Sequence, residues 1–546
     1  MGRSHFLPRN VSRNVKGTDM DFAHISRRGL MLQAAALAGA ALTPAALAPR
    51  AFGQIPADDP FTLGVASGEP TSGGVVIWTR LAPRPFEPDG GMPPEAVPVR
   101  WEVAEDAGFS RIVRRGRTLA GPAAGHSVHV EVDGLRPARE YWYRFTMASG
   151  VSPVGRTLTA PPAGADVERL KVAFGSCHHF ETGYYGAYRH MAEDNPDLVF
   201  FLGDYIYERG PNPKAVVRQH KNPEIFALPD YRIRYATYKS DPLLQRAHAC
   251  APWMVMWDDH EVDNDYGADQ SEQFGTEFPD GAAGFLRRRA AAYQAYYEHM
   301  PLRRRTMPVG PDMLLYRALN WGRLAQFQLV DNRQYRSPRP CLTPADGFGK
   351  VVPDCEERRS PDRSMLGMKQ ERWLLDTLSA SKTKWNVLAQ QTLFAPVDVR
   401  TVSDGPSMWN SDNWDDAPAT RERILQRWTE AKVSNPLVLG GDIHTFAAAE
   451  LSARPGEACV APSFVGGSIT SPGATAEASQ RTMAMNPHIK VHNGQVRGYG
   501  RVDFERRSAR VTFRALDDVK REDSGISTLA AFDLEDGQHG VVKASL

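Results

Sequence analysis

The sequence predicts a mixed α/β protein that carries an all-β domain in front of it. Short apolar runs at residues 170–174, 198–202 and 253–257 are typical of strands buried on both faces, as in parallel sheets. Residues 56–162 instead show short strands of alternating polarity, separated by Gly, Pro and Asp turns. The chain has 546 residues, which is too long for one hydrophobic core, so two or three domains are expected.

The first domain, at residues 56–162, is expected to be a β-sandwich of the immunoglobulin or fibronectin type. Its predicted strands lie at residues 75–80, 99–103, 127–132 and 141–145. The segment at residues 135–143 resembles the corner that precedes a late strand in fibronectin-type domains. Because no group of catalytic residue types occurs in this segment, it is predicted to act as a cover or spacer.

The second domain is expected at residues 168–520, followed by a C-terminal extension at residues 521–546. A strand at 170–174, a helix at 184–193 and a strand at 198–202 form a βαβ unit, whose two strands should be parallel neighbours. The later predicted elements are a strand at 253–257, a hairpin of 313–319 and 324–330, a helix at 368–379, and strands at 385–389, 437–439, 502–504 and 509–514.

Residues 1–53 are predicted to form a twin-arginine export signal. An arginine pair precedes a Leu- and Ala-rich run, and small residues allow cleavage after Ala48 or Gly53. Thr43 and Pro44 interrupt the run, which disfavours a permanent membrane anchor; an uncleaved anchor is the alternative. The prediction implies a contact with the twin-arginine translocase during export and a location in the periplasm or outside the cell.

Composition excludes some classes of function. The net charge of +1 creates no overall field toward nucleic acid or acidic membranes, so no nucleic-acid-binding patch is predicted. Five cysteines in this length do not form a disulfide scaffold. Cys341 and Cys355 bracket a polar loop, and export would allow them to pair or to remain free thiols.

Groups that can bind metals follow four of the predicted strands, at the edge of the sheet where sites form in α/β proteins. A single Asp or His there most often caps a helix or completes a core contact, but four such ends in one domain indicate a common site. The residues are Cys177, Asp204, Tyr207, Asp259, His260, Asp442 and His444. Polar loops at residues 211–228 and 401–419 are predicted to lie over this site.

Three of these ends resemble the metallophosphoesterase motif series: Gly203-Asp204-x-x-Tyr207, Asp259-His260-Glu261 and Gly441-Asp442-x-His444. With Phe-Gly-Ser-Cys at residues 174–177 in place of the usual first Asp-x-His, the set is similar to that of the PhoD-type alkaline phosphatases. Residues 64–71 and 76–80 extend the resemblance into the first domain. It implies a four-layer metallophosphoesterase β-sandwich flanked by helices, and a metal centre like that of purple acid phosphatases.

The resemblance implies that Asp204 bridges two unlike metal ions. A site for ferric iron (Fe3+) would consist of Asp204, Cys177, Tyr207 and His444. The charge of this ion would ionise the thiol and the phenol, which are normally protonated. A second site would consist of Asp204, Asp259 and Asp442. Its oxygen ligands favour calcium (Ca2+). His178 and His179 receive no role.

Further residues near these motifs are candidates with open alternatives. Asp263, Asn264 and Asp265 add oxygen ligands for a second Ca2+, or are solvated loop side chains. By resemblance, His260 contacts the phosphate or the leaving group; the alternative is that it only orients the metal ligands. Arg333 either places a cation on phosphate oxygens or is a surface residue at a strand end.

The function expected from this resemblance is that of a secreted phosphoesterase. A metal-bound hydroxide would attack the phosphorus of phosphomonoesters and phosphodiesters directly. A phospholipase-D-like phosphodiesterase is the nearest alternative. A non-catalytic surface-binding protein with structural metals is an alternative of another class, and it predicts closed sites whose ligands all come from the protein.

Overall fold

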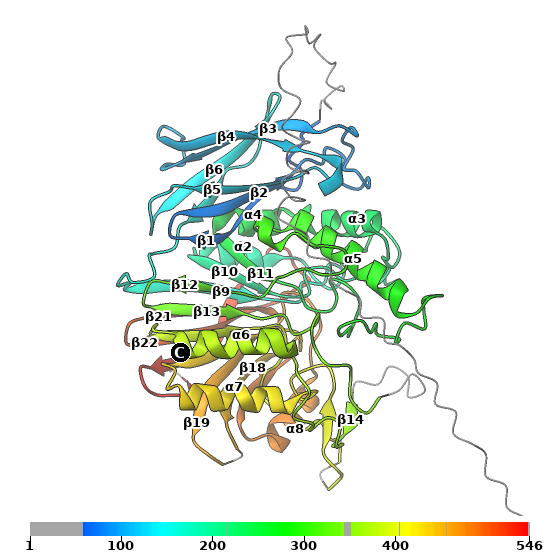
Figure 1. Cartoon of the computed structure of the whole chain (residues 1–546), viewed down its shortest axis with the longest axis vertical. Coiled ribbons are helices and arrows are strands. Elements are labelled where there is room, and N and C mark those ends of the chain that lie inside the picture. The colour runs from blue at the N-terminus through cyan, green and yellow to red at the C-terminus, as the bar shows by residue number, and fades with distance from the viewer. Residues whose placement is uncertain (1–57, 216, 343–350, 403, 455, 544–546) are drawn as a thin grey trace, which may run out of the picture. The chain divides into compact units, whose positions relative to one another are not determined.

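The computed structural model describes residues 58–543 except 216, 343–350, 403 and 455 (Figure 1). The predicted export signal therefore lies outside the described residues. Within the described ranges, no helix combines the length and the apolar content needed to cross a membrane. Two large sheets and the helices around them confirm the predicted mixed α/β class.

The larger sheet has ten strands and runs through most of the chain. Their spatial order is β24 (Val542–Lys543), β23 (Ile526–Glu535), β22 (Ser508–Leu516), β21 (Gly498–Glu505), β9 (Arg169–Gly175), β10 (Leu198–Leu202), β11 (Pro252–Met256), β1 (Val65–Thr71), β2 (Gly74–Arg80) and β5 (Ser127–Asp133). Strands β9 and β10 are parallel, with α2 (Gly186–Glu193) between them in the chain. The predicted βαβ unit is therefore confirmed.

The second sheet has seven strands. Their order is β12 (Arg317–Trp321), β13 (Ala325–Leu329), β15 (Trp385–Ala389), β17 (Pro436–Gly440), β19 (Cys459–Gly466), β18 (Phe446–Ser452) and β20 (Ile489–Asn493). Strands β12 and β13 pair in antiparallel register, as the predicted hairpin required. Strands β13, β15, β17 and β19 are parallel neighbours. The carboxyl end of β17 therefore faces the same way as those of its parallel neighbours.

Side chains on opposite faces of β10 show how the layers pack. Phe200 faces the second sheet, where its ring centroid lies 4.7 Å from that of Phe327. The next residue, Phe201, points the other way and stacks on Trp253, which in turn contacts Tyr188 of α2. Because side chains alternate along a strand, five consecutive apolar residues pack on both faces of the sheet within one core.

Helices cover the outer faces of both sheets (Figure 1). On the ten-stranded sheet they include α3 (Leu228–Lys239), α4 (Pro242–Cys250) and α5 (Ala282–His299). On the seven-stranded sheet, α6 (Gly367–Ala380) and α7 (Pro418–Glu430) bury Leu374 and Trp428 against Leu388 and Val438 in a second core. Within the part of the chain that the structure describes, the other helices are α8 (Ala476–Met485) and the short 3-10 helices η1 (Pro122–Ala124) and η2 (Arg304–Thr306).

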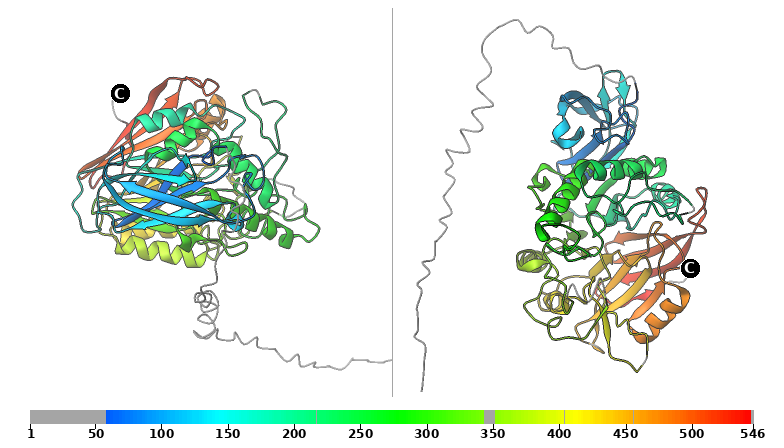
Figure 2. Two further views of the ribbon diagram at one scale, coloured as in Figure 1. Left: turned by 90° about the horizontal axis from the view of Figure 1, so that it is seen from above. Right: turned by 90° about the vertical axis from the view of Figure 1, so that its right-hand side faces the viewer.

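The N-terminal strands are divided between a separate sheet and the ten-stranded sheet. Strands β3 (Val97–Ala104), β4 (Ile112–Ala120), β6 (Glu140–Met147), β7 (Gly150–Val151) and β8 (Gly155–Leu158) make a separate five-stranded sheet. It packs on β1, β2 and β5 around Val99, Ile77 and Tyr143 (Figure 2). Strand β1, however, pairs in parallel with β11 of the large sheet. The structure therefore joins, through one continuous sheet, two segments that the sequence analysis separated.

Two further segments differ from the sequence prediction. The predicted C-terminal extension supplies β23, which pairs along its length with β22, so residue 520 lies between two paired strands rather than after the last one. The predicted loop at residues 401–419 contains β16 (Met408–Asn410), which pairs with β14 (Val351–Pro353). Cys341 and Cys355 form a disulfide next to β14.

Candidate metal centre

The residues that follow β9, β10 and β17 turn sharply into a common site. Cys177, Asp204, Asp442 and His444 adopt left-handed backbone conformations, with φ of 59°, 57°, 63° and 52°. Such conformations cost free energy for residues other than glycine, and they gather where the surrounding structure holds a functional geometry. Each strand end thus points a donor side chain into the site instead of continuing its strand.

Glu261 fixes the ends of β10 and β11 relative to each other. Its carboxylate accepts backbone N–H bonds from Asp204 at 3.1 Å, Tyr205 at 2.6 Å and Asp258 at 2.8 Å. The approach is close enough that a Cβ on Gly203 would lie 2.3 Å from the Cβ of Asp258, and Gly203 has φ of 107°. Only glycine fits this position.

The four residues predicted to bind iron lie together. The ligand atoms of Cys177, Asp204 and His444 are within 4.8 Å of one another. The Tyr207 hydroxyl lies 2.9 Å from Asp204 Oδ2, 3.1 Å from His444 Nε2 and 2.6 Å from Ser471 Oγ. The structure therefore brings one thiol, one phenol, one imidazole and one carboxylate to a single point.

The chemistry of this group fits a highly charged cation. Burial, followed by the charge of Asp204, raises the pKa of both the Cys177 thiol and the Tyr207 phenol well above their ordinary values. Without a cation both groups stay protonated, whereas a trivalent ion would ionise them. Asp204 Oδ1 is buried and has no hydrogen-bond partner among the described residues, as expected for a ligand atom.

Carboxylates form further groups beside the first one. Ligand atoms within 4.8 Å of one another occur in Asp204–Asp259–His260, Asp258–Asp259–Asp442 and Asp259–Asp265–Asp412. Asp204 belongs to the thiol-containing group and to a carboxylate group, which is the geometry that bridging requires. Burial raises the pKa of Asp258 well above its ordinary value, and neighbouring carboxylates add to this effect against the opposing charge of Arg333. Such crowding of acids favours a bound cation.

The three predicted loop ligands after β11 have different surroundings. Asp265 lies in the group with Asp259, and its backbone N–H donates to Asp259 Oδ2 at 2.7 Å. Asp263 pairs with Arg288 at 2.9 Å instead. The Asn264 side chain donates its amide N–H to Glu272 Oε1 at 2.7 Å, so its role as a ligand stays a prediction.

His260 is held by a carboxylate that the sequence analysis did not single out. Its Nδ1 lies 2.6 Å from Glu208 Oε2, and Glu208 is almost fully buried. Although burial alone lowers the pKa of His260, Glu208, Asp259 and Asp204 raise it well above its ordinary value. Glu208 therefore orients the ring and favours its protonated form, beside the candidate metal ligands.

Arg333 is completely buried among carboxylates. Its Nε donates to Asp258 Oδ1 at 2.5 Å, and its terminal nitrogens donate to Asp412 at 2.5 and 3.1 Å. One of these terminal nitrogens, Nη2, also lies 3.6 Å from Asp259 Oδ1. These contacts exclude the alternative of a surface arginine. They favour a counter-ion that positions the acidic group, and the predicted contact with phosphate stays a prediction.

Some residues of the site lie beside predicted ligands in the sequence, and others have no signal in the sequence. Asp258 directly precedes the motif Asp259-His260-Glu261, Glu261 is its last residue, and Glu208 follows Tyr207 directly. Asp412 and Ser471 come from loops without a motif, and only the fold brings them here.

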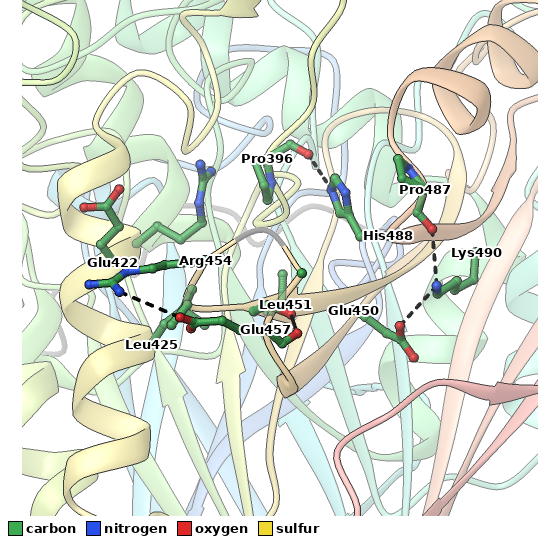
Figure 3. Close-up of a pocket in the computed structure, with 14 residues that line it drawn as sticks. Pro396, Glu422, Leu425, Glu450, Leu451, Arg454, Glu457, Pro487, His488 and Lys490 are labelled. Atoms are coloured by element: carbon green, nitrogen blue, oxygen red, sulfur yellow. Dashed lines mark hydrogen bonds and ion pairs between the residues drawn. The ribbon is translucent and has the colours of Figure 1, made fainter.

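A hollow of about 550 Å³ lies elsewhere, between α7 and the strands β18 and β20 (Figure 3). Its charged side chains pair with each other: Lys490 with Glu450 at 3.1 Å, and Arg454 with Glu457 at 3.8 Å. None of the candidate metal ligands lines it. It offers no concentration of charge of one sign to a substrate.

The fold and these groups define a mixed α/β protein with a candidate centre for more than one metal ion at its strand ends. A model of the PhoD-like phosphatase family matches residues 172–513, and a model of the N-terminal domain of PhoD-like phosphatases matches residues 46–161. Alkaline phosphatase D of Bacillus subtilis (strain 168) is 46% identical over 496 residues, covering 89% of this chain and 82% of that protein.

A solved structure described as "Structure of PhoD" superimposes with a TM-score of 0.84 at 45% identity, covering 90% of this chain and 93% of the other. The chain belongs to the PhoD-like phosphatase family. The family predicted from the motifs is thereby confirmed, and with it the enzyme class of phosphoric ester hydrolases.

Proposed function

We propose that the protein is an exported phosphoesterase that hydrolyses phosphomonoesters and phosphodiesters with Fe3+ and one or two Ca2+ ions. The observation that carries this proposal is the convergence of Cys177, Tyr207 and His444 on Asp204, with carboxylates on its other side. The relative named alkaline phosphatase D supports the monoesterase part.

Donor chemistry supports the assignment of the two kinds of ion. Thiolate, phenolate and imidazole suit ferric iron, so Cys177, Tyr207 and His444 would hold Fe3+ together with Asp204. Asp259 and Asp442 would hold Ca2+ with Asp204, because oxygen ligands suit a hard cation. When bound, these ions supply positive charge to the phosphoryl oxygens and lower the pKa of a water ligand near phosphorus.

Other residues of the site would donate a proton or position the groups that act. The imidazole of His260 lies at the partly exposed edge of the site, with 14% of its side chain accessible, and in its protonated form would donate a proton to the leaving oxygen. Glu208 orients this ring by accepting its Nδ1–H, and Arg333 positions Asp258 and Asp412 by donating hydrogen bonds to both carboxylates. The exposure of His260 and of His444, at 25%, also argues against the closed sites expected of a non-catalytic binding protein.

The proposal is tested by hydrolysis of nitrophenyl phosphate and bis-nitrophenyl phosphate with and without a chelator. We expect hydrolysis of at least the monoester, its loss on chelation and its return when iron and calcium are added back. If neither substrate is hydrolysed in a chelator-sensitive way, the proposal is wrong. The ratio of the two rates decides between a broad phosphatase and a phospholipase-D-like phosphodiesterase.

Export by the twin-arginine pathway to the periplasm or beyond is part of the proposal. The disulfide between Cys341 and Cys355 supports it, because such bonds persist in oxidising compartments. Peptide mapping of the exported protein should find its N-terminus after Ala48 or Gly53. A peptide that contains Arg27 in the mature protein would contradict cleavage.

Replacement of Tyr207 by Phe should remove the colour of the concentrated protein. A phenolate on ferric iron absorbs visible light by charge transfer, whereas a phenyl ring cannot bind the ion. The absorption spectrum of the iron-loaded variant checks this result, with Tyr184→Phe, outside the metal centre, as the matched control. A visible band that persists unchanged in Tyr207→Phe would remove Tyr207 from the iron site.

Replacement of Glu208 by Gln should lower kcat by about 10- to 100-fold, the usual effect of losing a residue that orients a group at a metal site. Glu208 raises the pKa of His260, so its loss lowers that pKa, and His260 loses its proton at a lower pH. The alkaline limb of the kcat profile should therefore move to lower pH. Glu422→Gln, on an exposed part of α7, is the control, and an unmoved limb would contradict the role of His260 as proton donor.

A further inference from the structure

His179 is an imidazole beside the metal centre without an assigned role. Its ring centroid lies 4.2 Å from that of Tyr207, and it stacks on His220 at 5.4 Å. The backbone carbonyl of His179 accepts a hydrogen bond from the Thr470 hydroxyl at 2.7 Å, which ties it to the loop that carries Ser471. The position of the ring is thus set by groups that also surround the candidate iron ligands.

Hydrogen bonds fix which nitrogen of His179 carries a proton. Nδ1 accepts the backbone N–H of Glu181 at 3.2 Å, so the proton of the ring is on Nε2. Among the described residues, Nε2 of His179 makes no hydrogen bond, and this atom is not fully buried. Because the side chain is partly exposed, the Nε2–H is accessible from solvent.

The neighbouring His220 differs in this respect. Its Nδ1 lies 3.1 Å from the Arg209 carbonyl, and its Nε2 lies 3.0 Å from the Tyr238 hydroxyl. Both nitrogens are therefore engaged within the protein. The ligand atoms of His179, Glu181 and His220 lie close together, but a metal ion there would have to replace these hydrogen bonds of His220.

His260 offers the closest parallel to His179. Both rings lie 4.2 Å from the Tyr207 ring, and both have Nδ1 engaged by the protein. They differ at this atom, because His260 donates Nδ1–H to a carboxylate whereas His179 accepts an N–H there. A neutral imidazole of this kind donates one hydrogen bond from Nε2 without giving up its proton.

We infer that His179 is a substrate-binding residue that donates its Nε2–H to a non-bridging oxygen of the bound phosphoryl group. The inference rests on the proposed function. In this arrangement His260 transfers a proton, while His179 holds the phosphoryl group in place. Its contribution should appear in the binding of phosphate esters and of inorganic phosphate, not in the proton-transfer step.

The test compares His179→Phe, which keeps a ring against Tyr207 but lacks the donor, with His179→Gln, which restores an N–H donor. His190→Phe, on α2, is the control. In the metal-loaded enzyme, His179→Phe should raise KM for nitrophenyl phosphate and Kd for inorganic phosphate about tenfold, with kcat changed less than about threefold. His179→Gln should return both constants to within about threefold of those of the wild type.

Unchanged KM and Kd in His179→Phe would overturn the inference, as would a Gln variant that behaves like the Phe variant. A loss of metal or of the visible band in His179→Phe would assign the residue to packing instead and also overturn it. Titration with inorganic phosphate needs no turnover. A wild type that hydrolyses nothing but binds phosphate through His179 would thus reject the proposed function and support the contact, and a wild type that binds no phosphate would reject both.

Discussion

Replacement of Asp204 by Asn is expected to lower kcat/KM for nitrophenyl phosphate at least about 1,000-fold, which corresponds to about 4 kcal/mol of transition-state stabilisation. Asp204 is the residue shared by the thiol-containing group and a carboxylate group. Asn keeps the shape of the side chain but removes its charge, and with it the ability to hold two cations at once. Elemental analysis should therefore show that the variant loses iron and calcium together.

A matched control separates this result from a general loss of structure. Asp376→Asn, on an exposed part of α6, removes one negative charge and should keep both metals and full activity. In the metal-free state Asp204→Asn should melt at or above the temperature of the wild type, because it relieves repulsion among buried acids. Full occupancy of either metal in Asp204→Asn would contradict bridging.

The sequence carried most of the information about the candidate site because the site is built at strand ends. A buried strand such as β10 appears as an uninterrupted apolar run, and its end is marked where Gly203 and Asp204 follow Leu202. The predicted and observed bounds of this strand coincide at Leu198–Leu202. Parallel pairing then places successive strand ends at one edge, so a one-dimensional pattern predicts a three-dimensional group.

Contacts between distant loops could not be predicted in the same way. Asp412 reaches Arg333 across 79 positions, and Ser471 reaches Tyr207 across 264. Nothing in the local sequence distinguishes these side chains from other loop residues. Their positions depend on how β16 and β19 are placed, and such placement is a property of the whole fold.

The sequence does not predict helices α3 and α5, for another reason. Their buried positions include Arg234 and Arg288 as well as tyrosines, so no continuous apolar stripe marks a helix. Arg234, for example, satisfies its guanidinium with carbonyls of Tyr207 and Arg209. Arginines that are buried against carbonyl or carboxylate partners look like surface residues in the sequence. A helix that contains them therefore looks exposed even when it is packed on both sides.

Lys239, at the end of α3, gives the second large expected effect, which concerns stability. Its side chain is buried, with Nζ 3.5 Å from His248 Nε2 and 4.3 Å from the centre of the Trp78 ring. Tyr205, whose hydroxyl lies 2.7 Å from His248 Nε2, completes the surroundings. Burial lowers the pKa of Lys239 from 10.5 to about 7.

The sign of the pH dependence follows from proton counts. Between about pH 7 and pH 10.5 the unfolded chain holds a proton on this lysine that the folded chain lacks. The free energy of unfolding therefore rises with pH across this window, by about 3 to 5 kcal/mol at most. Below about pH 7 both states are protonated, and the full cost of burying the charge remains.

Replacement of Lys239 by Met should remove this dependence, since Met fills a similar volume without a charge. Thermal unfolding of the metal-loaded proteins from pH 6.5 to 10.5 should show the variant melting several degrees above the wild type near pH 7. The difference should shrink as pH rises and become small by about pH 10.5, where the lysine also loses its proton in the unfolded chain and the cost of neutralising it disappears. Lys369→Met, on an exposed part of α6, should follow the wild type throughout.

A difference between Lys239→Met and wild type that does not change with pH would mean that the buried amine keeps its charge, held by Trp78 and its neighbours. The rise in stability toward alkaline pH would then need another titrating group.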